Sequence, residues 1–426
     1  MLTCLCSLAF LAQAQTILQC RQRFNTYLNF RGALDGVVKF DDDAIYLMSA
    51  GKREFAIYQE ELPALSAYFQ SSDAKQQAQL MRAKGTRKLS RRECDSILIN
   101  SESRDIRSAS YGQLPLKDVR IAIDPGHFGT TLAEARVEQK FLYFPKDPVK
   151  FPKDSVKLFE SSLTFNTALI LKNMLEEQGA RVFLSRDEGN YTSFNCTFHD
   201  WMSRHRKGTL DSLRGAGAIT EQKYRKLLKC NDYQFFWDFF RDYDLANRAA
   251  KINKFNPHVT LIIHYNVDEK NVPWKTHSRK NFSMTFIGGG FTLGDLQRDE
   301  SRMHFIRLLI TGQLTQSEKL SALTVFNFSK LLEIPIARQS DATYLAKNCL
   351  ATPSRGVFCR NLVLCRKINS PLVYGESLYQ DNEFEAERLM RSNLDLYGIK
   401  TNERLQKVAQ SYYNAVVDFV KGTSSQ

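Results

Sequence analysis

The chain has 426 residues, of which 43% are hydrophobic and 25% charged, and this composition excludes a disordered, a collagen-like and a polytopic membrane protein. Lysine and arginine number 59 against 46 aspartate and glutamate residues, so the net charge of +13 favours an acidic partner such as nucleic acid, anionic lipid or an anionic polymer. The length predicts two units, or one domain with large insertions.

The N-terminus resembles a secretory signal peptide. The run Leu2–Ala12 is apolar but too short to span a bilayer, and Ala12-Gln13-Ala14 has the A-x-A pattern of a cleavage site. The alternative is an N-terminal helix that packs on the core. We expect residues 1–14 to be removed on export, and we expect no transmembrane segment in the remaining chain.

Cleavage would leave seven of the nine cysteines, so at least one thiol would be free or would pair with another chain. Cys196 with Cys230, and Cys359 with Cys365, are candidate disulfides. Residues 15–116 carry no motif and are expected to form a small N-terminal region of unknown role. Its basic run, Lys84–Arg92, is interpreted as a solvated face or linker rather than a nucleic-acid contact.

From residue 117 onward, short apolar runs alternate with segments of helical periodicity. The pattern predicts strands at 119–123, 181–185, 259–263 and 371–374, and helices at 163–178, 244–255 and 405–420. This alternation predicts an α/β fold, with a twisted, mostly parallel sheet flanked by helices. Residues 187–243 and 269–340 do not fit it, and we interpret them as two insertions in one catalytic domain at 117–426.

Ionisable residues follow three of the predicted strands. His127 comes after the first strand, His264 after the strand at 259–263, and Glu376 after the strand at 371–374. Ligands of open α/β sheets gather at the carboxyl ends of the strands, so these side chains are expected to converge. Glu160 opens the helix at 163–178, where a carboxylate also complements the helix dipole.

A catalytic zinc ion takes three protein ligands and keeps one position for water. His127, Glu160 and His264 can fill the three positions, and Glu376 can then hold the water and take its proton. Taken singly, each residue has a more ordinary explanation, such as a satisfied histidine or a helix cap. Their joint placement favours the zinc site.

These segments resemble the catalytic domain of zinc-dependent N-acetylmuramoyl-L-alanine amidases of the amidase-3 type. The resemblance is carried, in order, by Val119–Gly129, by Glu160 with the helix and strand that lead to Arg186, by Leu245–Asn266 with Arg248, by Arg355–Leu362, and by Pro371–Asn382. It implies that His127, Glu160 and His264 bind zinc (Zn²⁺) and that Glu376 is catalytic.

The chain departs from the family pattern in several places. Phe128 stands where the first of two glycines is usual. The stretch from His127 to Glu160 is longer than usual, so Glu134 and Glu138 are rivals for the second ligand position. Glu160 is preferred because only it is followed by the matching helix. The residues beside His264 and after Glu376 also differ, which affects substrate detail rather than metal binding.

The resemblance implies hydrolysis of the amide between N-acetylmuramic acid and L-alanine in peptidoglycan, by an exported enzyme of the periplasm or cell wall. Peptidoglycan and an activator protein are the expected partners, and nucleic acid is not. The rival hypotheses are a different zinc hydrolase, such as a peptidase, and a non-catalytic binding protein suggested by charge alone. A pure binder needs neither Glu160 nor Glu376.

The aromatic-rich insertion at 187–243 has two interpretations. One is a surface elaboration closed by a Cys196–Cys230 bridge. The other is a lid that packs its aromatic side chains over the zinc cleft and restrains activity.

Overall fold

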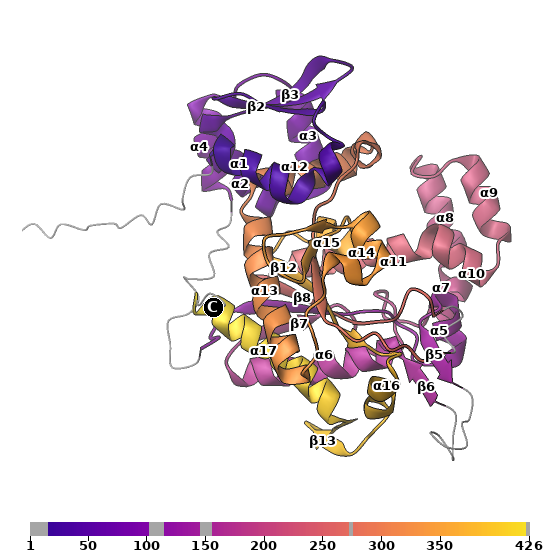
Figure 1. The fold of residues 1–426 in the computed structure, drawn as a ribbon. Coiled ribbons are helices and arrows are strands. Elements are labelled where there is room, and N and C mark those ends of the chain that lie inside the picture. Colours follow the sequence, from indigo (N-terminus) through magenta and orange to yellow (C-terminus); the bar gives the residue numbers. More distant parts are fainter. Residues whose placement is uncertain (1–15, 102–114, 145–155, 272–275, 423–426) are drawn as a thin grey trace, which may run out of the picture. The chain divides into compact units, whose positions relative to one another are not determined.

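The structure is a computed structural model that describes residues 16–101, 115–144, 156–271 and 276–422, so the predicted signal peptide lies outside the described residues (Figure 1). The chain divides into two compact units. The first comprises Met1–Ser103 and Phe291–Gly312, and the second Arg104–Gly290 and Gln313–Gln426. No helix within the described ranges has the length and apolar character needed to span a membrane.

The first unit contains a three-stranded antiparallel sheet and a helical layer that includes α12 from the later part of the chain. The Nε atom of buried Arg23 donates to the carbonyl of Leu309 on α12 at 2.8 Å. Helix α12 lies within residues 269–340, which were expected to be the second insertion of the catalytic domain. The strands are β1 (Val38–Phe40), β2 (Ala44–Ser49) and β3 (Lys52–Tyr58); the helices are α1 (Ile17–Arg23), α2 (Leu62–Ser71), α3 (Ala74–Lys84), α4 (Arg91–Ile99) and α12 (Asp299–Ile310); shorter turns are η1 (Phe24–Leu28), η2 (Phe30–Gly32), η3 (Gln59–Glu61) and η6 (Leu293–Gln297).

The basic run at 84–92 is largely paired within this unit. Lys84 is buried and forms an ion pair with Glu61 at 3.0 Å, and Lys88 pairs with Glu60 at 2.9 Å on the surface. Lys84 therefore belongs to the interior of the unit and not to the solvated face expected from the sequence, whereas Lys88 lies on the surface.

A seven-stranded sheet of order β10-β11-β9-β12-β8-β4-β7 forms the centre of the second unit. Its strands β7, β4, β8 and β12 are parallel, whereas β9 is antiparallel to β12 and β10 is antiparallel to β11. The predicted α/β class is therefore confirmed. The strands are β4 (Arg120–Pro125), β7 (Arg181–Leu184), β8 (Val259–Asn266), β9 (Met284–Ile287), β10 (Leu350–Ala351), β11 (Val357–Cys359) and β12 (Leu372–Tyr379); two hairpins pair β5 (Phe141–Phe144) with β6 (Val156–Phe159), and β13 (Leu394–Leu396) with β14 (Ile399–Thr401).

Helices cover both faces of this sheet because successive strand residues point to opposite sides. Ile121 and Ile123 belong to the core under α6, α13 and α17, whereas Ala122 belongs to a second core beneath α11 and α15 (Figure 1). Gly179, with φ of +87°, ends the predicted helix α6. The helices are α5 (Leu132–Glu138), α6 (Glu160–Glu177), α11 (Arg241–Phe255), α13 (Gln313–Leu332), α14 (Thr343–Asn348), α15 (Val363–Lys367), α16 (Glu383–Leu389) and α17 (Glu403–Val420), with a short turn η7 (Gln339–Asp341).

Two strands continue further than the sequence indicated. Strand β8 includes His264, and β12 includes Glu376, and the two residues are direct neighbours in the parallel ladder. The apolar run stops at residue 263, but backbone pairing carries the strands on through polar residues. Both side chains are thus held by sheet backbone rather than by loops.

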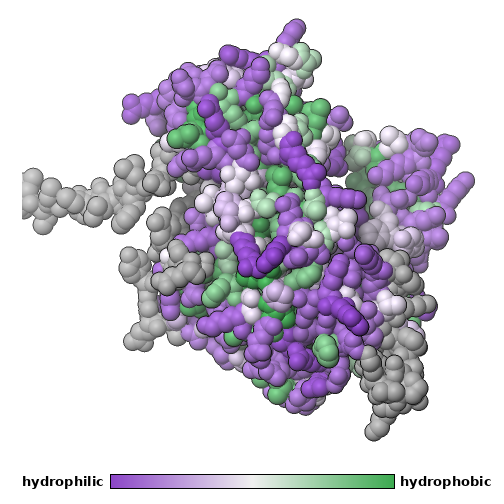
Figure 2. Space-filling model, viewed as in Figure 1, coloured by the Kyte–Doolittle hydropathy of each residue, from purple (hydrophilic) through white to green (hydrophobic). Residues whose placement is uncertain are grey.

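The first insertion is a helical subdomain with an aromatic core of its own. Phe198, Trp201, Phe236 and Phe240 are buried together with Phe128, the residue directly after His127. Figure 2 shows mostly hydrophilic side chains on the visible face of α8 and α9. The helices are α7 (Phe198–Arg204), α8 (Arg206–Gly215), α9 (Glu221–Lys229), α10 (Asp232–Phe235) and the π-helical turn η5 (Phe236–Phe240).

The cysteines of the described chain, from Cys20 onward, are all free thiols. Cys196 and Cys230 pack separately against the aromatic core of the insertion, so the disulfide considered for this segment is not formed. Cys359 and Cys365 are buried and unbridged as well. Their proximity in sequence did not bring the sulfur atoms of either pair into a bond.

Candidate metal centre

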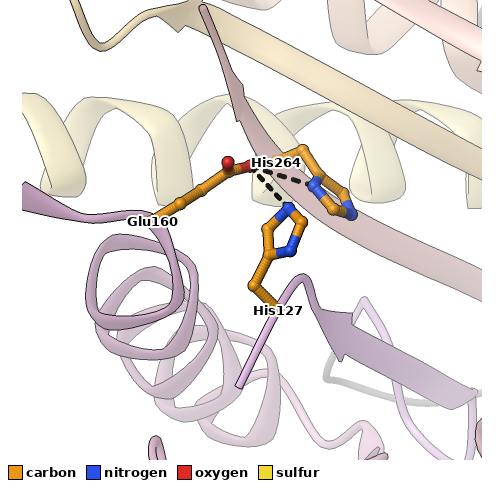
Figure 3. Close-up of side chains that lie close together, drawn as sticks. All are labelled: His127, Glu160 and His264. Atoms are coloured by element: carbon orange, nitrogen blue, oxygen red, sulfur yellow. Dashed lines mark hydrogen bonds and ion pairs between the residues drawn. The ribbon is translucent and has the colours of Figure 1, made fainter. Parts of the chain in front are cut away.

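Three side chains from different elements meet at the carboxyl edge of the sheet (Figure 3). His127 follows β4, Glu160 is the first residue of α6, and His264 lies on β8. One ligand atom from each residue lies within 4.8 Å of the others. Both imidazoles approach the same Glu160 oxygen, at 3.3 Å from Nε2 of His127 and 3.0 Å from Nδ1 of His264.

The loop that carries His127 is fixed by buried hydrogen bonds. Gly126 donates its N–H to the carbonyl of Ile263 at 3.0 Å, and its own carbonyl accepts from the Thr164 hydroxyl at 2.6 Å. His127 then takes a left-handed backbone conformation with φ of +61°. Holding this less common conformation requires the surrounding contacts, so the loop is specified by more than its own sequence.

Two buried arginines donate hydrogen bonds to the backbone of the loop that carries His127. Arg248 donates to the carbonyl of Pro125 at 3.1 Å and forms an ion pair with Asp244 at 2.8 Å. Arg186 donates to the same carbonyl at 3.2 Å. Burial alone would lower the pKa of Arg248, but the negative charges of Asp244 and Asp124 have the larger effect and raise that pKa above its usual value. The guanidinium therefore stays charged. These are the arginines that the family resemblance singled out.

The electrostatics of the three side chains differ. Burial lowers the pKa of His127, but the carboxylates of Glu160 and Glu138 outweigh it and raise that pKa to about 9. Burial lowers the pKa of His264 to about 4. Glu160 is buried, yet the charge of His127 holds its pKa well below the usual range. Without a metal, the Glu160 carboxylate therefore lies between a protonated His127 and a neutral His264, and a bound cation would take the place of the proton on His127.

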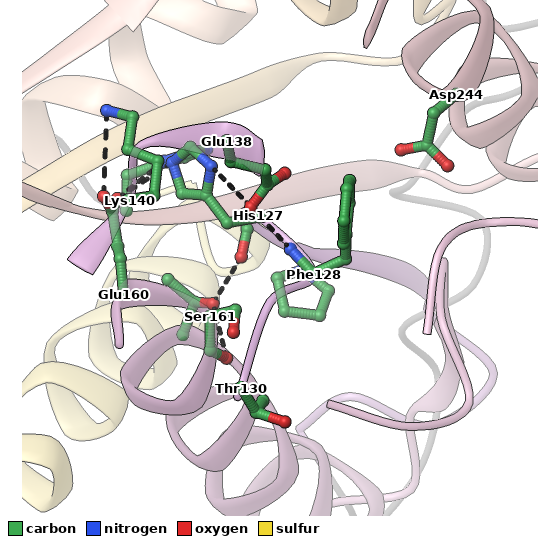
Figure 4. A network of polar contacts seen from close by, with 12 residues as sticks. His127, Phe128, Thr130, Glu138, Lys140, Glu160, Ser161 and Asp244 are labelled. Atoms are coloured by element: carbon green, nitrogen blue, oxygen red, sulfur yellow. Dashed lines mark hydrogen bonds and ion pairs between the residues drawn. The ribbon is translucent and has the colours of Figure 1, made fainter. Parts of the chain in front are cut away.

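Glu138 and Lys140 surround the three residues (Figure 4). The Oε2 atom of Glu138 lies 3.5 Å from Nδ1 of His127 and accepts from the N–H of Phe128 at 3.1 Å. Lys140 lies 3.9 Å from the second oxygen of Glu160. The other rival ligand, Glu134, instead accepts from the N–H of Phe198 at 3.1 Å. Glu160 is thus the carboxylate that stands between the histidines.

Glu376 projects from β12 beside His264. Its Oε2 atom is buried and has no hydrogen-bond partner among the described residues. Burial, followed by the negative charge of Glu160, raises the pKa of Glu376 to about 8. Glu376 forms no salt bridge with an arginine or lysine within the described chain, and Arg360 acts on it only as a more distant charge. An unpaired carboxyl group with such a pKa suits proton transfer near neutral pH.

Sequence reasoning missed several neighbours of this centre. Tyr374 stacks on the ring of His264, with centroids 4.4 Å apart and an interplanar angle of 8°. Tyr374 lies two residues before Glu376 on the same face of β12, which is the signal that could have found it. Glu138 was considered only as a ligand, and Lys140 carried no pattern that marked it.

This arrangement defines a class of protein. A mostly parallel sheet that brings two histidines and a glutamate together at its carboxyl edge, beside an unpaired glutamate, is a centre suited to metal-assisted hydrolysis. The donor atoms come from three separate elements, so the fold itself assembles the site.

Comparison with known proteins gives the family. The family model for N-acetylmuramoyl-L-alanine amidases matches residues 121–418. No curated protein matches significantly. Because the match spans well over half of the chain and contains the whole site, the chain belongs to the N-acetylmuramoyl-L-alanine amidase family. The enzyme class expected from the sequence is confirmed, and the reaction is hydrolysis of the amide between N-acetylmuramic acid and L-alanine in peptidoglycan.

Solved structures of amidases are similar at low identity. The CwlD amidase from Clostridioides difficile, in complex with the GerS lipoprotein, is 15% identical; 72% of this chain and 100% of that chain are covered, and the TM-score is 0.39. Ami1 from Mycobacterium smegmatis is 13% identical, with 72% and 99% covered and a TM-score of 0.39. An amidase from Clostridium difficile 630 is 13% identical, with 72% and 98% covered and a TM-score of 0.38.

Proposed function

We propose that this amidase is zinc-dependent, that His127, Glu160 and His264 bind the zinc ion, and that Glu376 carries the proton. The observation that supports the proposal is the meeting of three ligand atoms within 4.8 Å beside an unpaired buried carboxyl oxygen. Two imidazole nitrogens and one carboxylate oxygen are a known donor set for catalytic zinc, and they leave one position open.

The residues of this chain then have distinct roles. Zinc, when bound, polarises the amide carbonyl and activates water. Glu376 accepts the proton of the attacking water and returns it to the nitrogen of L-alanine, which would otherwise leave as an unstable anion. Glu138 holds the ring of His127 through Nδ1, so that Nε2 faces the centre. The ring of Tyr374 fixes the plane of His264.

The charge of the chain agrees with a cell-wall substrate. Peptidoglycan is an anionic polymer, and the chain carries a net charge of +13. We therefore propose that the enzyme is exported and acts in the periplasm or cell wall, after removal of residues 1–14. An activator protein stays a prediction from the family resemblance.

Metal content and product mass test the proposal together. The purified protein should contain about one zinc ion, and His264→Ala should lose it while His199→Gln, on α7, keeps it. Digestion of defined muropeptides should release peptides with a free N-terminal L-alanine. Cleavage inside the stem peptide would instead indicate a peptidase, and full zinc retention by His264→Ala would remove this histidine from the site.

A further inference from the structure

The helical segment that closes the first insertion carries two exposed aromatic rings. Tyr233 on α10 and Trp237 on η5 are 50% and 37% exposed, and their ring centroids lie 6.2 Å apart. The guanidinium of Arg241, at the start of α11, lies over the Trp237 ring at 5.2 Å from its centroid. These three residues are spaced four apart and contact one another in turn, and we call them the aromatic platform.

Formation of the core does not explain the exposure of the two rings. Phe235, Phe236 and Phe240 of the same segment are buried in the aromatic core of the insertion. Tyr233 and Trp237 face outward instead, where polar side chains would serve the fold equally well. Trp237 also lies in a π-helical turn, a backbone irregularity that is frequent at functional sites. Single exposed aromatic residues are ordinary, but two adjacent rings with a cation indicate a binding surface.

Ring contacts join the platform to the loop of the first proposed ligand. The Trp237 ring packs edge-to-face on Phe236, with centroids 5.2 Å apart. Phe236 in turn contacts the ring of Phe128 at a centroid distance of 5.9 Å, and Phe128 directly follows His127. Two successive ring contacts therefore connect Trp237 with the residue next to the centre.

A second connection runs through α10 and α5, which lie next to each other (Figure 1). Asp232, directly before Tyr233, lies 3.5 Å from Nε2 of His199, and Nδ1 of His199 lies 2.5 Å from Glu134 on α5. The same helix α5 carries Glu138, which belongs to the surroundings of the metal centre. Both rings of the platform are thus anchored to elements that border the centre.

We propose that the aromatic platform binds the glycan strand of peptidoglycan, beyond the muramyl residue whose amide is cleaved. This inference rests on the proposed metal centre, because the place of the platform along the strand is judged from it. A pyranose ring presents a face of C–H groups that packs on an aromatic ring, and its hydroxyl groups point outward to polar side chains. Arg241 lies over the Trp237 ring and can donate to those hydroxyl groups.

The size of the platform favours a sugar chain over a protein partner. Two rings and one guanidinium supply far less surface than the roughly 800 Å² per partner that a stable protein interface buries. The neighbouring helices α8 and α9 present mostly hydrophilic side chains on their visible face (Figure 2). A glycan strand instead repeats a ring that fits a narrow stripe, and it continues in both directions from the muramyl residue.

Binding of a glycan without peptides tests the inference separately from the reaction. Oligomers of N-acetylglucosamine and N-acetylmuramic acid, freed of stem peptides, lack the scissile amide, so calorimetric titration reports binding without turnover. The native protein should bind them, and Trp237→Ala and Tyr233→Ala should each weaken binding by about 10-fold, roughly the effect of losing one stacked ring. Trp237→Phe should keep part of the affinity. Phe326→Ala, which removes a 45% exposed ring from α13, is the matched control and should bind like the native protein.

Substrate length gives the kinetic counterpart. On strands of several disaccharides that carry stem peptides, the two alanine variants should lose about 10-fold in kcat/KM, through KM, because the platform contributes binding and not chemistry. On N-acetylmuramoyl-L-alanyl peptide, which is too short to reach the platform, both variants should keep the native rate.

The outcomes are distinguishable. Native-like glycan binding by both alanine variants would overturn the inference, and absence of binding by the native protein would overturn it in favour of a protein partner. Equal losses on the short substrate would also overturn it, because they would show that the rings only support the loop of His127. Failure of the native enzyme to cleave either substrate would count against the proposed metal centre, while the glycan titration would still decide the role of the platform.

Discussion

Gly126 lies directly against the imidazole of His264. A Cβ atom on Gly126 would fall 2.3 Å from Cε1 and 2.5 Å from Nε2 of that ring, distances that side chains do not tolerate. Gly126, which directly precedes the proposed ligand His127, therefore packs against the ring of the second proposed ligand, His264. Position 126 therefore requires glycine, because only a residue without a side chain leaves room for the ring of His264 beside Glu160.

Gly126→Ala should lose zinc while the sheet stays folded. The added methyl group must displace the ring of His264, and a shift of that ring breaks the ligand geometry. Zinc content of the purified variant, with circular dichroism for the fold, measures the effect. Gly208→Ala on α8 is the control, because nothing lies within 4 Å of a Cβ there. A zinc-replete Gly126→Ala protein would show that His264 does not need this position.

The strands and the three converging residues were predictable because local patterns specify them. Apolar runs indicate β4 and β8, helical spacing indicates α6, and residues at the carboxyl ends of parallel strands must lie near each other. His127, Glu160 and His264 were found in this way. The prediction placed His264 and Glu376 after their strands because it followed hydrophobicity, whereas pairing between β8 and β12 depends on backbone hydrogen bonds.

Features that depend on distant contacts were not predictable. Nothing in the sequence of α12 shows that it joins the first unit, because that depends on contacts with residues near 23 and 82. Glu138 reaches His127 only because α5 folds back over the loop and ends at Gln139 in a left-handed conformation. Cys196 and Cys230 share a segment, but the aromatic core around them determines where each sulfur points.

Glu138→Gln should weaken zinc binding by about 10- to 100-fold while the fold is kept. The glutamine still accepts from the N–H of Phe128 but lacks the negative charge beside Nδ1 of His127. Titration against a chromophoric chelator measures the affinity. Glu134→Gln is the matched control on the same helix, since Glu134 contacts His199 and not His127. Equal affinities for the two variants would mean that Glu138 does not tune the ligand.

Removal of the insertion should lower peptidoglycan cleavage. The aromatic side chains of 187–243 surround Phe128, which has contacts with Phe198, Phe236 and Phe240 at centroid distances of 5.9 to 6.2 Å. The insertion thus supports the loop of His127. Deleting the insertion would expose Phe128 and remove the contacts that hold the loop of His127 in position for metal binding. A deletion variant that cleaves faster than the native enzyme would favour the lid.

Phe128→Ala examines the same support with a smaller change. Truncation of a buried phenylalanine should cost about 3–5 kcal/mol in the free energy of unfolding, measured with denaturant. Tyr233→Ala, at a half-exposed ring of the insertion, should cost much less. Similar losses in the two variants would show that Phe128 is not the link between the insertion and the centre.

Glu376→Gln should keep zinc and fold but lose at least about 100-fold in rate, because the amide keeps the shape of the side chain and cannot take up the proton. The unpaired Oε2 atom and the raised pKa of Glu376 support this role. Glu387→Gln, an exposed change on α16, is the control. Rates on purified peptidoglycan, with zinc content from the same samples, separate the outcomes. Near-native activity of Glu376→Gln would remove Glu376 from the proton transfer, whereas loss of zinc would make it a ligand and reopen the role of Glu160.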